Sequence, residues 1–401
     1  MRVPEVLITG DQQLLKQINR MALVRQICAK PALSRADLAD TLGLTKSTVS
    51  LLVRELMDEG WLTEHELVTT GSLGRRPTPL HINPQRLVLL GAEVGVGNTR
   101  VVATSLTGQV LASIVVDYAG AVDPQLCLQA VAKAFSKIAK LEPISDREIC
   151  GLGVGLPGGV DEAQGILHFA PNLGWRNVNV AGQLRKYLKG TRLENTPLFI
   201  QNEADAAALA EFEFTDQVSA DPLVYVSIGY GVGAGVVVND RLLTGYRGFA
   251  GEIGHTILQA NGPACSCGRL GCAEAFIGLK ALLREAGCGP NAKQMLTLVE
   301  LRTRVKAREP AAVQSAEKAG RYLGVLLQNL WVAFDPMRIV LGGAALELGD
   351  AFLQPALQTL GGYASAAQLT PPVVTISRFG ENAVAVGAAA LVRYRITRPF
   401  A

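Results

Sequence analysis

The chain has 401 residues, which is too long for one ordinary domain and predicts two or three compact units. Hydrophobic residues make up 49% of the sequence and charged residues 18%, which excludes disorder for most of the chain, and its 42 glycines favour an α/β protein. The N-terminus lacks a basic region followed by an apolar core, and no apolar run approaches the roughly 18 residues of a membrane span, so we expect a cytoplasmic protein with no membrane partner.

The first predicted element is a helix over residues 14–28. Its apolar positions recur at steps of three and four residues: Leu14, Ile18, Met21, Ala22 and Ile27. A short second helix follows with Ser34 as its cap, and a third begins at Lys46 after a tight turn at Gly43 and a cap at Thr45. This order of elements predicts a helix-turn-helix.

The third helix has the features of a recognition helix. Val49, Val53 and Leu56 form an apolar face. Hydroxyls and cations remain for a DNA groove and its phosphates: Thr45, Lys46, Ser47, Thr48, Ser50 and Arg54. The segment that follows, through the run GSLGRRPTP, predicts a β-hairpin wing whose Arg75 and Arg76 suit a minor groove or phosphates.

The charge of this region does not by itself indicate nucleic acid. Residues 1–80 hold 10 lysines and arginines against 9 aspartates and glutamates, so DNA contacts depend on local placement. An alternative interpretation is a small trihelical domain whose arginines only keep a linker soluble. The run L-A-x-x-L-G-L-T-x-S-T-V-S with a following G-W-L favours DNA binding and resembles the winged-helix domains of bacterial repressors.

From about residue 86 the pattern changes to short apolar runs that alternate with helical segments. LVLLGAEVG, RVVATSL and QVLASIVV come first, followed by a helix near 124–140 and by ICGLGVGLPG. In a second set LFIQN leads into the helical ADAAALAEF, and LVYVSIGYG, GAGVVVND, RIVLGGA and PVVTIS follow. Two α/β lobes around a cleft are predicted, and such clefts bind small ligands.

Seven motifs of this region together resemble the ROK family, whose name covers repressors, open reading frames and sugar kinases of the actin-like ATPase fold. They are GLGVGLPGGVD at 151–161, APNLGW at 170–175, QNEADAAALAE at 201–211, SIGYGVGAGVVV at 227–238, GEIGH at 251–255, CSCGRLGCAE at 265–274 and VLGGA at 340–344. The resemblance implies an α/β protein in three parts. We expect a winged helix-turn-helix over 1–82, a first lobe over 86–200, and a second lobe over 201–401 whose C-terminal helix packs back on the first.

Four residues have the spacing of a metal site. His255, Cys265, Cys267 and Cys272 form the pattern H-x9-C-x-C-x4-C, which supplies one imidazole and three thiolates, the tetrahedral set that zinc prefers in structural sites. Four protein ligands leave no open position, so the predicted zinc is structural and fixes His255. The alternative is four ordinary buried residues. The other cysteines are predicted to be packing residues: Cys28, Cys127, Cys150 and Cys288.

The family resemblance also implies a sugar pocket, because carboxylates and amides bind rings of hydroxyls. By motif position its residues are Gly158, Asn172, Asn202, Glu203, Glu252, His255 and Glu274. Each is alternatively a surface polar group. The zinc would support the sugar indirectly, by setting where His255 and Glu274 stand.

The kinase features of the family are altered. The catalytic base is expected as aspartate in an Asn-Asp pair, but this chain has Asn202 and Glu203, whose carboxylate lies one methylene further out. The phosphate turn Asp-x-Gly-Gly-Thr is replaced by EVGVGNTR at 93–100, and Tyr230 replaces a small hydroxylated residue. We therefore predict a sugar site without efficient phosphoryl transfer, with no catalytic residue and no ATP. Glu203 would be catalytic only in a kinase.

These features predict a sugar-responsive transcriptional repressor of carbohydrate-metabolism genes. Its partners would be a double-stranded DNA operator, a sugar or sugar phosphate, and copies of itself in a homodimer or homotetramer. Sugar binding would close the lobes and move the wing through the segment from Arg75 to Pro84. The alternatives are an active carbohydrate kinase with an attached DNA-binding domain, and a DNA-binding protein whose kinase-like domain serves only for assembly.

Overall fold

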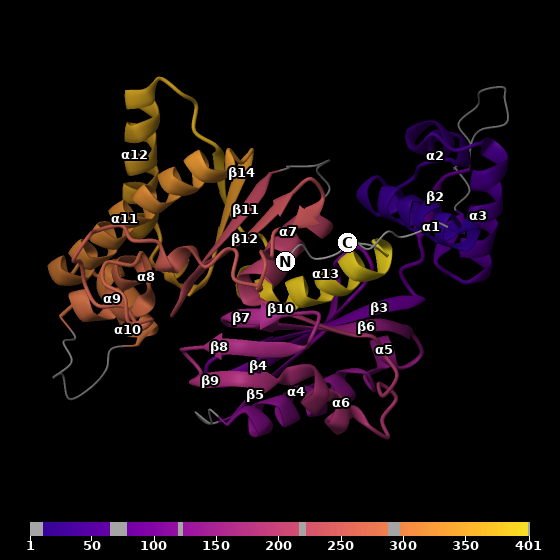
Figure 1. Ribbon diagram of the computed structural model, residues 1–401, viewed down its shortest axis with the longest axis horizontal. Helices are drawn as coiled ribbons and strands as arrows, with labels where there is room; N and C mark the ends of the chain where they lie inside the picture. The colour runs from indigo at the N-terminus through magenta and orange to yellow at the C-terminus, as the bar shows by residue number, and fades with distance from the viewer. Residues whose placement is uncertain (1–10, 65–77, 119–122, 216–221, 288–296, 400–401) are drawn as a thin grey trace, which may run out of the picture.

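The computed structural model describes residues 11–64, 78–118, 123–215, 222–287 and 297–399. Figure 1 shows a small, mostly helical unit beside two α/β lobes, with the C-terminal helix running between the lobes toward the small unit. The predicted fold class, a winged helix-turn-helix followed by a two-lobed actin-like domain, is confirmed. In the described part of the chain, no helix is long and apolar enough to cross a membrane.

The N-terminal unit contains three helices and a two-stranded sheet. Their bounds are α1 Gln12–Ala29, α2 Arg35–Leu42, α3 Lys46–Asp58, β1 Leu62–Glu64 and β2 Leu80–Ile82. The predicted caps are confirmed: Ser34 accepts from the amide of Asp37 in a capping box, and Thr45 accepts from the amide of Thr48. Gly43 ends α2 at φ 65°, a left-handed conformation that suits glycine. The antiparallel pair β1–β2 flanks the segment predicted to form the wing, and the predicted wing residues Arg75 and Arg76 lie outside the described residues.

The buried face of α1 differs from the predicted one. Met21, Leu23, Val24 and Ile27 are buried, whereas Ile18 is 36% exposed. Helix α1 packs against α2, α3 and β2 of its own unit and also against α13, so its burial is set by partners from both parts of the chain.

The first lobe is built on a five-stranded sheet in the order β10-β6-β3-β4-β5. Its elements are β3 Leu87–Val94, β4 Asn98–Thr104, β5 Val110–Asp117, α4 Pro124–Ile138, α5 Glu142–Ser145, β6 Glu148–Leu156, β7 Gly159–Asp161, β8 Ile166–Ala170, β9 Trp175–Asn179, α6 Val180–Leu188 and β10 Leu198–Asn202. Helix α4 covers one face of the sheet, and strands β7, β8 and β9 form a separate three-stranded sheet (Figure 1).

The second lobe has a five-stranded sheet in the order β13-β12-β11-β14-β15. Its elements are α7 Glu203–Glu213, β11 Leu223–Ile228, β12 Val232–Val238, β13 Arg241–Leu242, η1 Ile253–His255, α8 Glu274–Ile277, α9 Leu279–Glu285, α10 Leu298–Lys306, α11 Pro310–Phe334, β14 Arg338–Gly342, η2 Ala344–Leu348, α12 Asp350–Ala367, β15 Val373–Ile376, η3 Gly380–Asn382 and α13 Ala383–Thr397. The long helices α11 and α12 pack on each other and share a core with β11 and β14.

Helices α13 and α7 lie between the two sheets. Helix α13 packs on β3 and β6 of the first lobe, and α7 packs on α13 and on β11 and β12 of the second. The approach is close because glycine faces the helix backbone: a Cβ at Gly153 would lie 1.8 Å from the carbonyl oxygen of Ala388. A larger side chain at this position would separate the helix from the sheet.

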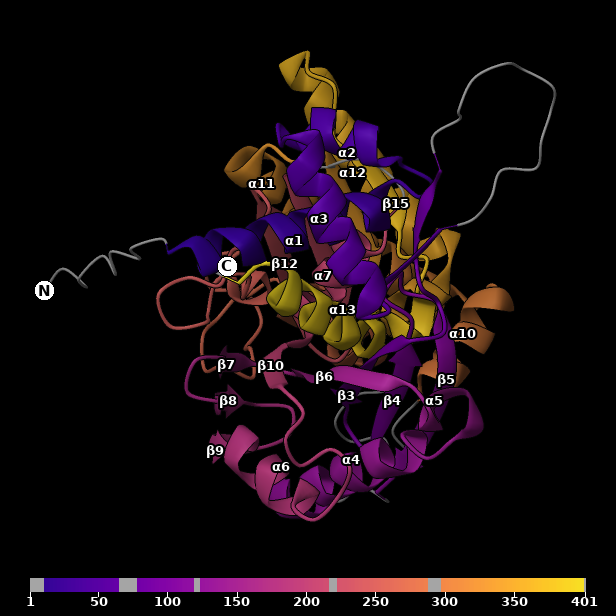
Figure 2. The ribbon, with the colours of Figure 1, turned by 90° about the vertical axis from the view of Figure 1, so that its right-hand side faces the viewer.

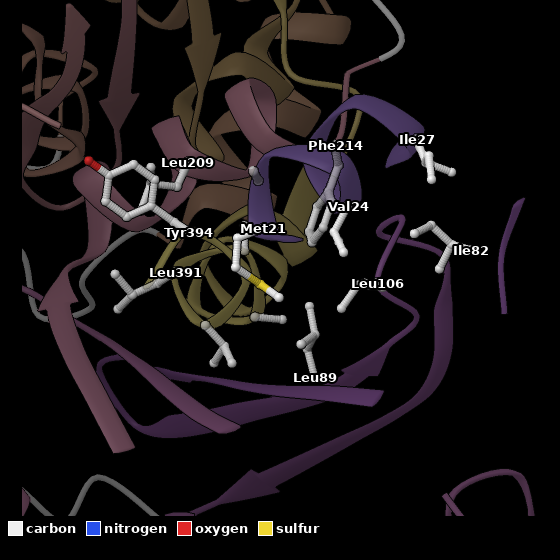
Figure 3. Packing of buried hydrophobic residues seen from close by; sticks show 14 of the residues in the cluster. Met21, Val24, Ile27, Ile82, Leu89, Leu106, Leu209, Phe214, Leu391 and Tyr394 are labelled. Carbon is white, nitrogen blue, oxygen red and sulfur yellow. The ribbon is translucent and has the colours of Figure 1, made fainter. Parts of the chain in front are cut away.

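One hydrophobic core connects the N-terminal unit to the lobes. Figure 3 shows Met21 and Val24 of α1 beside α13, with Phe214 close to Val24, and these residues form one cluster with Leu391 and Leu106. Figure 2, which views the molecule from the side of the N-terminal unit, shows α1 lying next to α13. The N-terminal unit is therefore packed against the lobes and is not only tethered to them by the chain.

Candidate functional site

All seven residues predicted to bind sugar line one pocket between the lobes. They come from separate segments of the chain: the turn before β7, the turn after β8, the start of α7, the turn η1 and the start of α8. The members are Gly158, Asn172, Asn202, Glu203, Glu252, His255 and Glu274. The pocket thus presents amide, carboxylate and imidazole groups from both lobes to the same small space.

Asn202 fixes the geometry at the floor of the pocket. Its side-chain oxygen accepts from the amides of Ala204 and Asp205, at 2.7 and 3.3 Å, and so caps α7. Its side-chain nitrogen donates to the carbonyl oxygen of Gly158 at 2.8 Å. Gly158 has φ 89°, and a Cβ there would lie 2.0 Å from the carbonyl oxygen of Phe169, so only glycine fits this turn. Asn202 therefore ties the turn to α7.

Two other pocket side chains are held by hydrogen bonds of their own. Glu274 accepts from the amide of Val232 at 3.2 Å and from the hydroxyl of Ser266 at 2.9 Å. Asn172 accepts from the ammonium of Lys280 at 3.1 Å. Side chains held in this way lose little freedom when a ligand binds, so the pocket is preorganised for hydroxyl groups.

Half-buried carboxyl groups crowd the pocket. Burial raises the pKa of Glu203 to about 8, and the nearby carboxylates of Glu93, Glu252 and Glu274 contribute to the increase. Burial also raises the pKa of Glu252, although His255 acts in the opposite direction. Such groups can accept hydrogen bonds from hydroxyls when ionised, and can donate one when protonated.

Replacing Glu203 by glutamine is expected to stabilise the sugar-free protein at high pH. The folded chain holds the proton of Glu203 up to about pH 8, whereas the unfolded chain releases it near the ordinary value of 4.5. Stability therefore falls as pH rises between these values, and E203Q is exempt from this loss. At about 1.4 kcal/mol per pKa unit, the free energy of unfolding of E203Q should exceed that of the parent protein by on the order of 2–4 kcal/mol more at pH 8.5 than at pH 4.5. Urea unfolding of both proteins at the two pH values measures this difference.

A matched control for this measurement is Glu148→Gln, because the side chain of Glu148 is 53% exposed at the surface. Its free energy of unfolding should differ from that of the parent protein by a similar amount at both pH values. An E203Q effect that does not change with pH would contradict the raised pKa.

The four predicted metal ligands lie together beside the pocket. The ligand atoms of His255, Cys265, Cys267 and Cys272 are all within 4.8 Å of one another. The Sγ atoms of Cys267 and Cys272 are 3.7 Å apart, and Sγ of Cys265 is 3.7 Å from Nδ1 of His255. Tetrahedral zinc with Zn–S bonds of about 2.3 Å requires sulfur atoms about 3.8 Å apart, whereas a disulfide requires about 2.05 Å. The cluster fits a four-coordinate metal.

The two nitrogens of His255 have different neighbours. Nδ1 faces the thiols, and Nε2 lies 3.8 Å from a carboxylate oxygen of Glu252 in the pocket. A metal bound at Nδ1 would leave Nε2 protonated and directed toward the pocket. Ser266 lies between two of the cysteines and donates to Glu274, so the metal loop is joined to the pocket at a second point.

The predicted DNA-contacting residues of α3 lie on its outer side. Val49, Leu52, Val53 and Leu56 are buried, and Thr45, Lys46, Ser47 and Arg54 are exposed, with Thr48 and Ser50 half-buried. A stripe at steps of three and four residues consists of Ser47, Ser50, Leu51 and Arg54. Leu51 is 52% exposed and was not among the predicted contacts; its exposure on a recognition helix suits a thymine methyl group.

Two acidic residues at the C-terminal end of α3, Glu55 and the C-cap Glu59, are paired with basic side chains of α1. Lys16 donates to Glu55 at 2.6 Å, and Arg20 is paired with Glu59. Neither Lys46 nor Arg54 is paired with an acidic side chain in the described parts of the chain. The positive charges of α3 are therefore left available on the side away from the core.

An ion-pair cluster that the sequence did not indicate joins α1 to the lobes. We call it the inter-domain cluster: Arg25, Glu213, Asp240, Arg393 and Arg398. Arg25 donates to Asp240 at 2.9 Å, and Arg398 donates to both oxygens of Asp240 at 3.0 and 2.6 Å. Glu213 lies 2.5 Å from Nη1 of Arg398 and accepts from Nε of Arg393 at 2.6 Å. Burial alone would lower the pKa of Arg398, but the carboxylates of Glu213 and Asp240 raise it above its ordinary value.

The inter-domain cluster lies at the far end of the helix that begins in the pocket. Helix α7 carries Glu203 at its first position and Glu213 at its last. The side chains of Glu213, Arg393 and Arg398 are only 2%, 8% and 9% exposed. One short helix thus contacts the pocket at its N-terminus. At its C-terminus it is linked to α1 through the ion pairs of Arg398 with the half-exposed Asp240 and of Asp240 with Arg25.

A helix-turn-helix unit joined to a two-lobed α/β domain with a polar pocket defines a DNA-binding protein of the actin-like ATPase fold. Comparison with known proteins agrees: the winged helix-turn-helix DNA-binding pattern matches residues 17–63 and the ROK family pattern matches residues 89–395. The chain belongs to the ROK family, and its architecture is that of a ROK transcriptional regulator.

Relatives with both parts align along nearly the whole chain. The xylose repressor of Caldicellulosiruptor bescii is 30% identical over 399 residues, covering 96% of this chain and 97% of that protein. The crystal structure of a ROK family transcriptional regulator, a homologue of the Escherichia coli MLC protein, superposes with a TM-score of 0.78 at 25% identity, covering 96% and 97% of the two chains. A glucokinase of Halalkalibacterium halodurans, 29% identical, covers 66% of this chain and 82% of its own length.

Proposed function

We propose that this protein is a cytoplasmic, sugar-responsive transcriptional repressor of carbohydrate-metabolism genes. The observation that carries the proposal is that α7 begins in a pocket of carboxylates and amides and ends in a core shared with α1 of the DNA-binding unit. The relationship to a xylose repressor along 96% of the chain favours an aldose such as xylose as the effector. The pocket favours a neutral sugar over a phosphorylated one, because carboxyl groups line it and its described lining residues include no lysine or arginine to bind a phosphate.

We assign the metal cluster to structural zinc. Three thiolates and one imidazole are the ligands that zinc prefers, and the distances between them suit a tetrahedral shell with no open position. When bound, the ion supplies a rigid anchor for the loop from Thr256 to Cys272. His255 then holds its Nε2 proton toward a sugar hydroxyl, and Glu274 accepts from another.

The signal would travel along α7. Ligand in the pocket draws the two lobes onto it, and α7 lies between their sheets. A shift of α7 moves Glu213 against Arg398, and Asp240 passes the shift to Arg25 on α1. This route is added to the predicted one through the segment from Arg75 to Pro84, part of which lies outside the described residues. Sugar binds more tightly to the conformation of the protein that binds DNA less well, and the ratio of its affinities for the two conformations limits how far it lowers the affinity for the operator.

The DNA-bound form would be a homodimer, or a tetramer built from such dimers. Two recognition helices related by two-fold symmetry would contact an inverted repeat, with half-sites about one helical turn apart. A change in the position of α1 then alters the spacing of the two α3 helices. A small movement within each chain would thereby reduce the fit to both half-sites.

The test uses an operator fragment selected by the full-length protein from a random-sequence DNA pool. Fluorescence anisotropy gives the Kd for this fragment with and without D-xylose, D-glucose and N-acetylglucosamine 6-phosphate. At least one neutral sugar should raise the Kd by 10-fold or more, within the usual range of allosteric coupling. A DNA affinity that none of the sugars changes would contradict the proposal.

Lys46→Ala and Arg54→Ala are each expected to weaken binding to this fragment by about 10-fold at moderate salt. Each removes a phosphate contact, so the slope of log K against log salt should fall by about one. The same anisotropy titration, repeated at several salt concentrations, measures both effects. Lys140→Ala, an exposed lysine after α4, is the matched control and should change neither quantity. A reduced affinity with an unchanged salt slope would contradict the assigned phosphate contacts.

We expect no ATP consumption with any sugar of a broad panel in a coupled assay. Glu93 stands where kinases of this family have an aspartate, and burial raises its pKa to about 7 in spite of the nearby Arg100. Arg100 is itself paired with Glu381 at 2.8 Å, just before α13. A half-protonated carboxyl group is a poor ligand for the magnesium of a nucleotide. Sugar-dependent ATP consumption would favour the alternative, a kinase in which Glu203 is the base.

A further inference from the structure

A second and wider cavity opens directly from the sugar pocket. It has a volume of about 830 Å³ and shares five lining residues with the pocket: Gly158, Pro171, Ala250, Glu252 and His255. Because the two cavities meet at Glu252 and His255, a molecule bound in the pocket can extend past these side chains into the wider space. We call this space the outer cavity.

Aromatic rings line the outer cavity, in contrast to the polar sugar pocket. Phe169 comes from β8, and Tyr246 and Phe249 come from the loop that follows β13. Tyr246 is 91% exposed and Phe249 is 40% exposed. Exposed aromatic side chains that gather in one concave site are typical of ligand-binding surfaces.

The two phenylalanine rings are held in position. Phe249 lies against Gly159, where a Cβ would be 2.2 Å from the ring, and it stacks on His168 with ring centres 6.2 Å apart. The guanidinium of Arg176 lies 4.4 Å from the centre of the Phe169 ring. Rings fixed in this way offer flat apolar faces at little cost in side-chain entropy.

Polar groups are also present in the outer cavity. Arg247 and Arg269 line it together with Thr256. A sugar ring has two faces of C–H groups and a rim of hydroxyls, so it can stack on an aromatic ring while its hydroxyls accept from guanidinium groups and donate to a hydroxyl. The composition of the outer cavity matches both parts of a sugar ring.

We propose that the outer cavity is a subsite for a second sugar unit, so that the effector is a disaccharide or short oligosaccharide whose terminal ring occupies the sugar pocket. This inference rests on the proposed sensing function. The inference goes beyond that function because it names the ligand class: a glycosidically linked sugar binds more tightly than the free monosaccharide. The aromatic residues Tyr246 and Phe249 provide this additional affinity.

The experiment measures Kd by isothermal titration calorimetry on the full-length, zinc-loaded protein. D-xylose and D-glucose are compared with their β-1,4-linked dimers, xylobiose and cellobiose. One dimer should bind at least 10-fold more tightly than its monosaccharide. In Tyr246→Ala and Phe249→Ala this advantage should fall to about 3-fold or less, with the monosaccharide Kd within 2-fold of the parent value. Tyr363→Ala, a half-exposed tyrosine on α12, is the control and should keep the full advantage.

Two results would overturn the subsite. The first is a dimer that binds no more tightly than its monosaccharide, and the second is an advantage that survives both aromatic substitutions. Xylose 1-phosphate tests whether the arginines serve an anion instead. The subsite is also overturned if xylose 1-phosphate binds more tightly than both xylose and xylobiose, and if this advantage is lost in Arg247→Ala or Arg269→Ala but kept in Phe249→Ala. Failure of the sensing function is distinct, because then neither monosaccharides nor dimers bind.

Discussion

Cys272→Ser is expected to remove bound zinc and to weaken sugar binding by about 10–100-fold. The hydroxyl of serine is a poor zinc ligand, and three remaining ligands cannot close a structural shell. Without the ion, Nδ1 of His255 loses its anchor, and Nε2 no longer points steadily at Glu252 and the pocket. Loss of the groups that orient a binding residue commonly costs one to two orders of magnitude.

The measurement pairs metal content with sugar affinity. Elemental analysis should give about one zinc per chain in the parent protein and close to none in C272S. Cys150→Ala removes a cysteine far from the cluster in sequence and should retain both zinc and sugar affinity. Chelation of the parent protein should reproduce the C272S phenotype, and added zinc should reverse it. A C272S protein without zinc that still binds sugar normally would show that the ion does not position His255.

The sequence was sufficient to predict the parts of the molecule that depend on local chemistry. Ser34, Gly43 and Thr45 mark the ends of helices by hydrogen bonds and backbone conformations within three residues of themselves, so their roles can be read without a tertiary structure. The metal cluster is almost as local, because its three cysteines lie within eight positions of one another. The pocket residues come from five segments, and only the family motifs indicated that these segments meet.

The contacts between units could not be predicted in this way. Arg25 and Asp240 are 215 positions apart, and Glu213 and Arg393 are 180 apart, so neither pair leaves a periodic signal. The predicted apolar face of α1 was wrong at Ile18 for the same reason. Periodicity indicates that a helix has a buried side, but it does not show that α1 packs on α13 as well as on α2, α3 and β2. Tyr246 and Phe249 lie in a loop, where no pattern distinguishes a ligand-binding ring from a surface ring.

The inter-domain cluster should make Glu213 one of the most sensitive positions in the protein. Glu213→Gln is expected to destabilise the folded state by about 3–5 kcal/mol, because it leaves the buried guanidinium groups of Arg393 and Arg398 without their shared counter-charge. Urea unfolding monitored by tryptophan fluorescence measures the loss. Glu148→Gln, at a half-exposed ion pair with Arg86, should cost less than about 1 kcal/mol and serves as the control. Equal losses in the two variants would contradict the importance of the buried pairs.

Arg25→Ala tests whether the inter-domain cluster carries the signal, because Arg25 is the member of the cluster that lies on α1. The side chain of Arg25 is 34% exposed, so its removal should leave the fold intact. Sugar should still bind with a Kd within about 3-fold of the parent value, because the pocket lies at the opposite end of α7. The change in DNA affinity on adding sugar should fall from at least 10-fold to about 3-fold or less, since α1 no longer follows Asp240. Arg241→Ala, at the exposed arginine next to Asp240, is the matched control and should keep the full response. If Arg25→Ala responds to sugar as fully as this control does, α1 receives the signal by another path, and the segment between the wing and the first lobe becomes the route to test.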